Sequence, residues 1–258
     1  MMQLNHVSCG YHGCAVLKNL SFSVSKGEVV CILGANGIGK TTLYRTLMNI
    51  LPPVAGCITI NGQDTRSMPR SVLARHIAYV PQSHRSVHPY TVLDVVTMGR
   101  TAHLALFQSP SKAEEALAWD AMQQLKIQHL ARRNFSEISG GERQLVYIAR
   151  ALAQNADILL MDEPTANLDL GRQAMIHQQI RALRRMGKAV VYSTHAPDDA
   201  FICGDTVVSL LGGSRYCAGK PEDILTEALF YEMYGVDVDI RSVATRFGSA
   251  HVCLPFVG

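Results

Sequence analysis

The sequence predicts an α/β fold with a mainly parallel sheet. Short and almost wholly apolar runs, such as Val29–Leu33 and Ile158–Met161, are typical of strands that are buried on both faces. Apolar residues at helical spacing follow the first run, and later runs repeat this alternation of strand and helix. Residues 91–154 depart from it, because they contain helical patterns and no convincing strand. We therefore predict an α/β core with a helical insert.

The remaining elements follow from the same patterns. Apolar residues from Leu43 to Leu51 share a spacing that predicts one helix, which a pair of prolines then stops. Residues 236–241 alternate strictly between apolar and polar side chains. This alternation predicts a half-exposed strand, paired with residues 251–255 across a turn at 247–249. Further strands are expected at residues 77–80, 189–192 and 206–211, and further helices at residues 112–125 and 142–154.

Composition and charge exclude several classes of protein. Of the 258 residues 48% are apolar and 17% are charged, which excludes a chain that is mainly disordered. The net charge of +3, without long blocks of one sign, argues against nucleic acid or an anionic membrane as the main partner. No apolar run reaches the roughly 18 to 20 residues that span a bilayer, and no charged leader precedes an apolar stretch. We therefore expect an intracellular protein.

The cysteines agree with a reducing compartment. The seven cysteines are scattered along the chain, and no two of them form a C-x-x-C pair. A disulfide framework or a zinc site would need paired spacing, so we expect neither. The cysteines are best interpreted as small apolar side chains.

The most specific motif follows the first predicted strand. Residues 34–42 match the pattern G-x-x-x-x-G-K-[ST] between a strand and a helix. Glycines let successive amides converge on a β-phosphate, and the helix N-terminus adds a favourable dipole. In this pattern Lys40 reaches the β- and γ-phosphates, and the Thr41 hydroxyl ligates Mg²⁺. The motif predicts a nucleoside triphosphate site formed by Gly34, Asn36, Gly37, Gly39, Lys40, Thr41 and Thr42.

Two carboxylates at the end of another strand supply the second half of such a site. Asp162 and Glu163 come directly after the run Ile158–Met161. Adjacent residues at a strand end point in different directions, so the two can hold different roles. We expect Asp162 to bind Mg²⁺, directly or through water, and Glu163 to orient and deprotonate an attacking water.

A third motif opens a predicted helix. Ser139, Gly140 and Gly141 precede an amphipathic stretch whose polar face carries Arg143, Tyr147, Arg150 and Gln154. Two glycines at a helix N-terminus leave the first amides bare, which makes an anion site with Ser139 as an added donor. A simple N-cap would explain the serine but not the glycine pair.

Together and in this order, the motifs resemble the nucleotide-binding subunit of an ATP-binding cassette (ABC) transporter over residues 1–235. In that family Tyr11 matches the aromatic residue that stacks on adenine, and Gln82 matches the Q-loop. His195 matches the switch histidine, which contacts the γ-phosphate. The signature is matched by Ser139, Gly140 and Gly141, and the D-loop by Ala166, Asn167, Leu168 and Asp169.

The resemblance implies a single ABC ATPase domain over residues 1–258. Its fold is that of a P-loop NTPase core with a mainly parallel sheet and an antiparallel β portion, formed by residues 1–88 and 155–235. The helical subdomain with the signature occupies residues 89–154, and a C-terminal extension follows at 236–258.

The resemblance also implies the chemistry and the partners. ATP with Mg²⁺ would lie between the P-loop of one copy and the signature of a second copy in a head-to-tail homodimer. The implied catalytic residues are Lys40, Gln82, Glu163 and His195, and the implied Mg²⁺ ligands are Thr41, Gln82 and Asp162. The implied location is peripheral, on the cytoplasmic face of the inner membrane. There the subunit would act with integral membrane permease subunits and, indirectly, with a periplasmic or surface substrate-binding protein.

Residues 92–100, followed by His103, are similar to the ATPases of type II importers. These take up iron–siderophore, haem, cobalamin or molybdate-type substrates, and the substrate contacts lie in other subunits. An exporter ATPase subunit and a soluble ABC ATPase without a transport role stay as alternatives. Glu142 departs from the family, which usually has glutamine there, so its carboxylate either faces away from the γ-phosphate site or weakens that contact.

Overall fold

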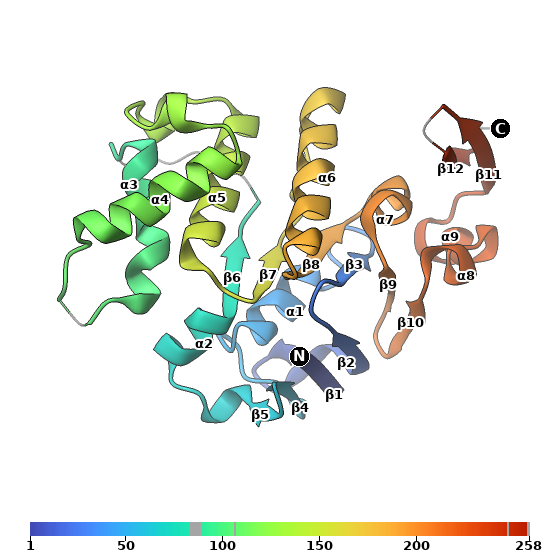
Figure 1. The fold of residues 1–258 in the computed structure, drawn as a ribbon. Helices are drawn as coiled ribbons and strands as arrows, with labels where there is room; N and C mark the ends of the chain where they lie inside the picture. Colours follow the sequence, from blue (N-terminus) through green and yellow to red (C-terminus); the bar gives the residue numbers. More distant parts are fainter. Residues whose placement is uncertain (83–88, 106, 247, 257–258) are drawn as a thin grey trace. The chain divides into compact units, whose positions relative to one another are not determined.

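The computed structural model describes residues 1–82, 89–105, 107–246 and 248–256. They form two compact units, Met1–Ser67 with Leu183–Gly258 and Met68–Ala182 (Figure 1). Both units combine parallel strands with helices, which confirms the predicted α/β fold. The finer division into a helical subdomain at 89–154 and an extension at 236–258 stays a prediction.

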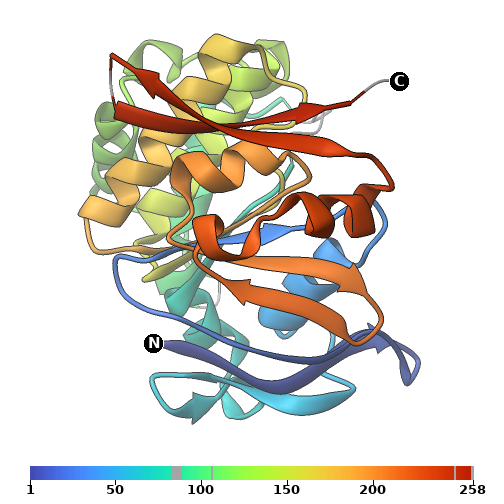
Figure 2. The same ribbon diagram turned by 90° about the vertical axis from the view of Figure 1, so that its right-hand side faces the viewer.

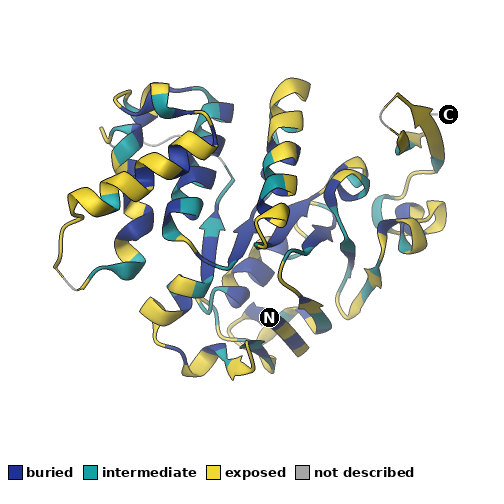
Figure 3. Cartoon of the chain, viewed as in Figure 1, coloured by how far each residue is buried: buried dark blue, intermediate teal, exposed yellow. Residues whose placement is uncertain are grey.

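The first unit is built on a mixed sheet with the strand order β10-β9-β3-β8. β3 runs parallel to both neighbours, with Val30 opposite Val191 and Thr206, whereas β10 is antiparallel to β9. Every residue of β3 is buried (Figure 3), as expected of an apolar strand that is covered on both faces. The strands span Val29–Leu33 (β3), Ala189–Thr194 (β8), Thr206–Gly212 (β9) and Arg215–Gly219 (β10).

The first unit also contains an antiparallel sheet. Its order is β2-β1-β4-β5, and Met2, Leu4 and Val7 of β1 are buried. This sheet confirms the expected antiparallel β portion. Its elements are β1 (Met2–Tyr11), β2 (Cys14–Val24), β4 (Ala55–Ile60) and β5 (Gln63–Asp64), followed by the 3-10 helix η1 (Thr65–Ser67).

The helix after the glycine-rich loop is shorter than predicted. α1 spans Lys40–Leu47 and does not continue to Leu51. Asn49 has the left-handed φ of 52°, so the helical backbone cannot pass through it. The amides of Ile50 and Leu51 instead turn back to the Arg45 carbonyl, and Ile50 is 61% exposed. The apolar spacing therefore predicted one helical turn too many at the end of α1.

The end of the chain forms short helices and a β-hairpin, all in the first unit. The predicted pairing is confirmed, with Ile240 opposite Cys253, and residue 247 of the predicted turn lies outside the described residues. Figure 2 shows the hairpin beside α7 and α9, in agreement with the contacts of its two strands. The elements are α7 (Pro197–Cys203), α8 (Pro221–Ile224), α9 (Glu227–Tyr234), β11 (Val238–Thr245) and β12 (Gly248–Pro255).

The second unit contains the predicted helical insert. Within the described part of residues 91–154, the β structure consists of one isolated bridge between Thr91 and Asn134. The parallel pair β6 (Ile77–Val80) and β7 (Ile158–Met161) flanks this insert in sequence, and the unit has further helices before β6 and after β7. The helices are α2 (Arg70–His76), α3 (Val92–Thr97), η2 (Met98–His103), α4 (Lys112–Gln124), η3 (Gln128–Leu130), η4 (Phe135–Glu137), α5 (Gly140–Gln154) and α6 (Leu170–Arg185), of which α6 ends in the first unit.

Side chains on the predicted polar face of α5 bond to the backbone of neighbouring elements. Arg150 donates to the Tyr79 carbonyl at 3.2 Å, and burial lowers the pKa of Arg150. The Gln154 amide donates to the Ile77 carbonyl at 2.8 Å. Gln154 also donates to the Ala74 carbonyl in the helix before β6. Long polar side chains of α5 thus bond the backbone of β6 and of that helix, because buried carbonyl groups require partners.

The basic residues near the end of α6 lie mostly on an exposed helix face, since Arg181, Arg184 and Arg185 are exposed. Arg184 also makes a 2.6 Å ion pair with Asp205, and the other Asp205 oxygen accepts the Val29 amide at 3.0 Å.

All seven cysteines are free thiols. None of the described helices is long and apolar enough to cross a membrane.

Candidate nucleotide site

The glycine-rich loop lies between β3 and α1 in the first unit. Gly34 is buried at the end of β3, whereas Asn36 and Gly37 are exposed. Gly37 and Gly39 have φ values of 77° and 115°, which favour glycine. A Cβ on Gly39 would also lie 3.0 Å from the Val16 side chain. The glycines are therefore required by backbone conformation and by a close approach.

The same loop leaves the N-terminus of α1 without a side-chain cap. Gly39 is the N-cap residue and makes no side-chain hydrogen bond. Lys40 is only 5% exposed, and its ammonium donates to the carbonyls of Gly34 at 2.7 Å and Ala35 at 3.2 Å. Thr41 is exposed beside it, and Thr42 is buried. The first amides of α1, the Lys40 ammonium and the Thr41 hydroxyl thus lie at one helix end. This arrangement fits a phosphate group with its Mg²⁺.

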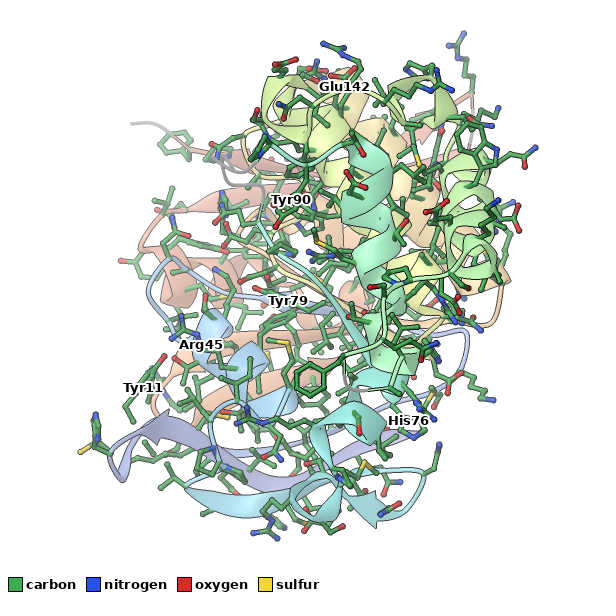
Figure 4. The ribbon with its side chains drawn as sticks, turned by 90° about the vertical axis from the view of Figure 1, so that its left-hand side faces the viewer. Tyr11, Arg45, His76, Tyr79, Tyr90 and Glu142 are labelled. Atoms are coloured by element: carbon green, nitrogen blue, oxygen red, sulfur yellow. The ribbon has the colours of Figure 1, made fainter. Side chains whose placement is uncertain are left out.

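Tyr11 stands at the end of β1, beside α1. The Arg45 guanidinium donates to its hydroxyl at 3.1 Å, and Figure 4 shows the two side chains next to each other. Hydrogen bonding by Thr42, with a smaller effect of Arg45, holds the pKa of Tyr11 below its ordinary value. The ring, which is 37% exposed, is thus tied through its hydroxyl to the helix that follows the phosphate loop.

His195 follows β8 in a segment whose backbone is held by buried polar groups. The Thr194 hydroxyl donates to the Asp199 carboxylate at 2.8 Å and accepts the Ala196 amide at 3.0 Å. The Tyr192 hydroxyl donates to the Asp199 carbonyl at 2.7 Å. Asp199 therefore fixes the turn on which the exposed His195 lies.

In the second unit, two carboxylates follow β7. Asp162 is 8% exposed and accepts a hydrogen bond from the Tyr79 hydroxyl at 3.3 Å. Glu163 has the left-handed φ of 44°, an uncommon conformation for a residue with a side chain. The Gln82 amide makes a long contact of 3.5 Å with the Glu163 carboxylate. Neighbouring residues thus direct their carboxylates to different partners, as the strand-end argument predicted.

The Ser-Gly-Gly-Glu segment forms a capping box at the start of α5. The Ser139 hydroxyl accepts the Glu142 amide at 3.3 Å, and the Glu142 carboxylate accepts the Ser139 amide at 2.7 Å. Of the two alternatives for Glu142, the structure favours a carboxylate turned to its own helix. Ser139 serves as the N-cap, so the role that sequence analysis set aside is present, whatever further role its hydroxyl has.

The glycine pair has two different environments. A Cβ on Gly140 would meet only the Arg143 guanidinium at 3.8 Å, whereas a Cβ on Gly141 would lie 2.4 Å from Cδ of Arg172. Arg172 in turn pairs with Asp169, with Nε 3.3 Å from the carboxylate. Asp169 also accepts the Arg172 amide at 3.0 Å. Arg172 therefore lies against Gly141 of the signature and pairs with Asp169 of the predicted D-loop.

Sequence reasoning missed the residues that hold the predicted ones in place. Tyr79, Arg172, Asp199 and Tyr234 each bond or pack against a predicted site residue or its immediate neighbour. Tyr79 had a signal, because it lies in the strand predicted at residues 77–80, three residues before Gln82. The other three lie outside every motif, so their partners become visible only in the fold.

A phosphate-binding loop at the end of a buried parallel strand and carboxylates after a second strand define a P-loop nucleoside triphosphatase. The ABC transporter family matches residues 17–166, which is more than half of the chain. The chain belongs to the ABC transporter family. It is an ATP-hydrolysing subunit of that family, with ATP as its nucleotide and Mg²⁺ as its metal.

Similar proteins support this assignment over most of the chain. An ABC transporter ATP-binding protein of Haemophilus influenzae, itself uncharacterised, is 41% identical over 226 residues, 88% of this chain and 86% of that one. The achromobactin transport ATP-binding protein CbrD of Dickeya dadantii is 33% identical over 251 residues, covering 97% and 93%. The molybdate import ATP-binding protein MolC of Haemophilus influenzae is 34% identical over 221 residues, covering 84% and 82%.

A solved structure resembles the whole fold. It is a chain of an ABC transporter described as being of the metal-chelate type and seen in an inward-facing conformation. The TM-score is 0.88 at 28% identity, and the match covers 99% of this chain and 97% of the other. The likeness extends beyond the family match, so it includes the hairpin at the end of this chain.

Proposed function

We propose that this chain hydrolyses ATP to power the import of a metal chelate through separate permease subunits in the membrane. The substrate class is that of iron–siderophore, haem, cobalamin or molybdate-type compounds. Two relatives support an importer, since one is named for achromobactin transport and the other for molybdate import. Their different cargoes show that similarity at this level does not choose among the substrates.

We assign the site residues as the sequence predicted them. Tyr11 stacks on the adenine, the loop from Gly34 to Thr42 holds the phosphates, and Thr41, Gln82 and Asp162 hold Mg²⁺. Lys40 and His195 stabilise the charge that develops on the transferred phosphoryl group. Ser139, Gly140, Gly141 and Asp169 serve the nucleotide of a second copy in a head-to-tail homodimer. The dimer would attach to the permease at the cytoplasmic face of the inner membrane, with a substrate-binding protein as an indirect partner.

The observation that carries the assignment of the hydrolytic residues is the setting of Glu163. Its backbone is in the left-handed region, and Pro164 follows it, so the surrounding structure must hold it there. Uncommon backbone conformations of this kind gather at sites where a side chain has to be aimed. The Gln82 amide lies 3.5 Å from the Glu163 carboxylate, so an uncharged polar group stands beside the position that we propose for the attacking water.

The test replaces this carboxylate by its neutral isostere. We expect Glu163→Gln to keep ATP binding and to lower steady-state ATPase activity by about 100-fold or more, because the general base is lost. Without turnover the ATP-bound dimer should accumulate in size-exclusion chromatography with Mg-ATP. The matched control is Glu115→Gln on α4, an exposed carboxylate in the same unit. Unchanged turnover in Glu163→Gln would remove the residue from its assigned role.

The transport role is tested separately from the chemistry. Affinity purification of the full chain from its native membranes should recover a permease in stoichiometric amount. Recovery of an export permease would favour the exporter alternative. Recovery of no membrane protein at all, with ATPase activity intact, would favour a soluble ABC ATPase without a transport role.

A further inference from the structure

The end of the chain contacts the segment that carries His195. The Tyr234 hydroxyl donates a hydrogen bond of 3.1 Å to the His195 carbonyl. Tyr234 is the last residue of α9, and Gly235 ends the helix in the left-handed conformation with φ of 68°. The helix stop therefore fixes the point from which this side chain reaches the segment after β8.

Tyr234 is itself well anchored. Phe230, one turn earlier on α9, is completely buried, and the two ring centroids are 6.3 Å apart. Burial raises the pKa of Tyr234 to about 12, so the hydroxyl stays protonated and donates at any physiological pH. A rigid aromatic donor on a buried partner can hold a backbone carbonyl in place.

The hairpin holds the other end of the same segment. Asp198, at the start of α7, accepts the Cys253 amide of β12 at 3.1 Å. On the next turn Phe201 stacks on His251, with centroids 4.9 Å apart and planes 21° from parallel. β11 is joined to α9 in turn, because the Glu227 carboxylate accepts the Ile240 amide at 3.3 Å. Both α9 and β12 therefore bond to the segment after β8 that carries His195.

His195 lies between fixed points along the chain. Thr194, the N-terminal neighbour of His195, donates to the buried Asp199 carboxylate, and α7 begins two residues after His195. The carbonyl of His195 accepts its hydrogen bond from Tyr234, a residue outside this segment. The peptide plane between His195 and Ala196 is held by this bond and by the Ala196 amide, which donates to the Thr194 hydroxyl at 3.0 Å. Loss of the Tyr234 bond would weaken that hold, and small displacements of a catalytic group have large effects on rate.

We infer that Tyr234 is a positioning residue for His195, and that the C-terminal helix and hairpin brace the switch segment for ATP hydrolysis. The inference rests on the role proposed for His195 and assigns a task to a part of the chain that lies outside the matched family region. Tyr234 acts through the His195 backbone and needs no contact with the nucleotide.

The experiment measures steady-state ATPase kinetics of the purified full chain. We expect Tyr234→Phe to lower kcat by about three- to tenfold, the effect of one neutral hydrogen bond, while KM for ATP changes less than about twofold. The matched control is Tyr231→Phe on the same helix, whose side chain is 57% exposed and should leave both constants unchanged. Equal kcat in Tyr234→Phe and the wild type would overturn the inference.

A second variant separates this inference from the proposed function. His195→Ala should lower kcat by about 100-fold. If it does not, the role proposed for His195 is wrong. If it does, adding Tyr234→Phe should lower the residual rate no further, because the group to be positioned is gone. A further loss by the same factor as in the wild type would show a purely structural effect and would contradict the inference.

A readout independent of rate guards against partial unfolding. The imidazole NMR signal of His195, in the full chain labelled with ¹³C-histidine, is assigned by its loss in His195→Ala. We expect the signal to shift in Tyr234→Phe and to stay in place in Tyr231→Phe. An unmoved signal in a folded Tyr234→Phe variant would also overturn the inference.

Discussion

The Tyr79 hydroxyl and the Asp162 carboxylate are joined by a hydrogen bond of 3.3 Å in the second unit. They belong to two parallel strands, since Tyr79 lies opposite Leu160 on β7 and Asp162 follows that strand. A buried carboxylate needs a hydrogen-bond partner, and a phenol donor stabilises it without cancelling its charge. The Tyr79 hydroxyl therefore orients the Asp162 carboxylate, and a Mg²⁺ ligand requires such an orienting partner.

This relationship predicts a metal-dependent effect of Tyr79→Phe. We expect the Mg²⁺ concentration for half-maximal ATPase activity to rise about tenfold or more, because the ligand's supporting bond is lost. Saturating Mg²⁺ should restore most of the rate. Titration of ATPase activity with Mg²⁺ measures both, with Tyr231→Phe as the exposed tyrosine control. An unchanged Mg²⁺ requirement would contradict a role of Tyr79 in holding Asp162.

The two roles of Ser139 can be separated by two substitutions. Ser139→Ala removes the N-cap and should cost about 1 kcal/mol of stability, whereas glycine at an N-cap costs only a few tenths. Both remove the hydroxyl. We therefore expect Ser139→Gly to melt close to the wild type while its ATPase activity falls as far as that of Ser139→Ala. Near-normal activity in Ser139→Gly would reduce Ser139 to a helix cap.

The buried strands were predictable because their signal is local. β3 and β7 are continuous apolar runs, and such runs have few alternatives to a strand covered on both faces. The end of α1 was not predictable, because Ile50 and Leu51 keep the apolar spacing while Asn49 turns the backbone. Apolar spacing predicts which side chains can be buried on one helix face, but it does not predict that a single left-handed residue ends the helix.

The segment used to assign the importer class shows a different limit. Gly99 has no room for a Cβ, which would lie 2.2 Å from the Arg150 carbonyl oxygen. Arg100 and His103 donate to or contact the carbonyls of Ala153 and Gln154 at 2.7 and 2.8 Å, and so close the C-terminal end of α5. Gly99, Arg100 and His103 thus pack against α5, which the sequence could not show because their partners are some fifty residues away.

The candidate site divides in the same way. The loop at 34–42 and the carboxylates at 162–163 follow strand ends, where local sequence dictates position. Arg172 and Tyr234 act on site residues through tertiary contacts, and their types are unremarkable in sequence. The motifs therefore predicted the residues that we assign to the chemistry, whereas the residues that orient them are visible only in the structure.

The capping box predicts a pH dependence that can be isolated by one substitution. Hydrogen bonds from Ser139, first its side chain and then its backbone, hold the pKa of Glu142 below its ordinary value. A carboxylate with a lowered pKa in the folded state contributes stability above its unfolded pKa, about 4.3, and loses it as pH falls through the folded value. Stability from this bond is therefore present at neutral pH and lost below about pH 4.

Glu142→Gln keeps a side chain that can close the box but does not titrate. We expect the wild type to melt above Glu142→Gln at pH 7 and the difference to narrow as the pH falls below about 4. Glu115→Gln, at an exposed position of α4, corrects for the general effect of removing one carboxylate. A difference in melting temperature that is constant from pH 7 to 3 would contradict this account of Glu142.

The last prediction asks why Gly141 must be a glycine. Arg172 crosses the position that a Cβ would occupy, so Gly141→Ala should cost about 1 to 3 kcal/mol through overpacking. Gly140→Ala, which meets only Arg143 at 3.8 Å, should melt at or slightly above the wild type because alanine favours the helix. Thermal melting of the two single variants compares a crowded and an open position in one turn.

A double variant then separates packing from catalysis. Arg172→Ala removes the obstacle together with a half-exposed ion pair to Asp169, which itself contributes about 0 to 1 kcal/mol. Gly141→Ala with Arg172→Ala should recover the melting temperature that Gly141→Ala lost. If ATPase activity recovers as well, Gly141 is needed only to admit Arg172. If stability returns while activity stays low, the bare backbone at Gly141 is needed by the nucleotide, as the proposed signature contact requires.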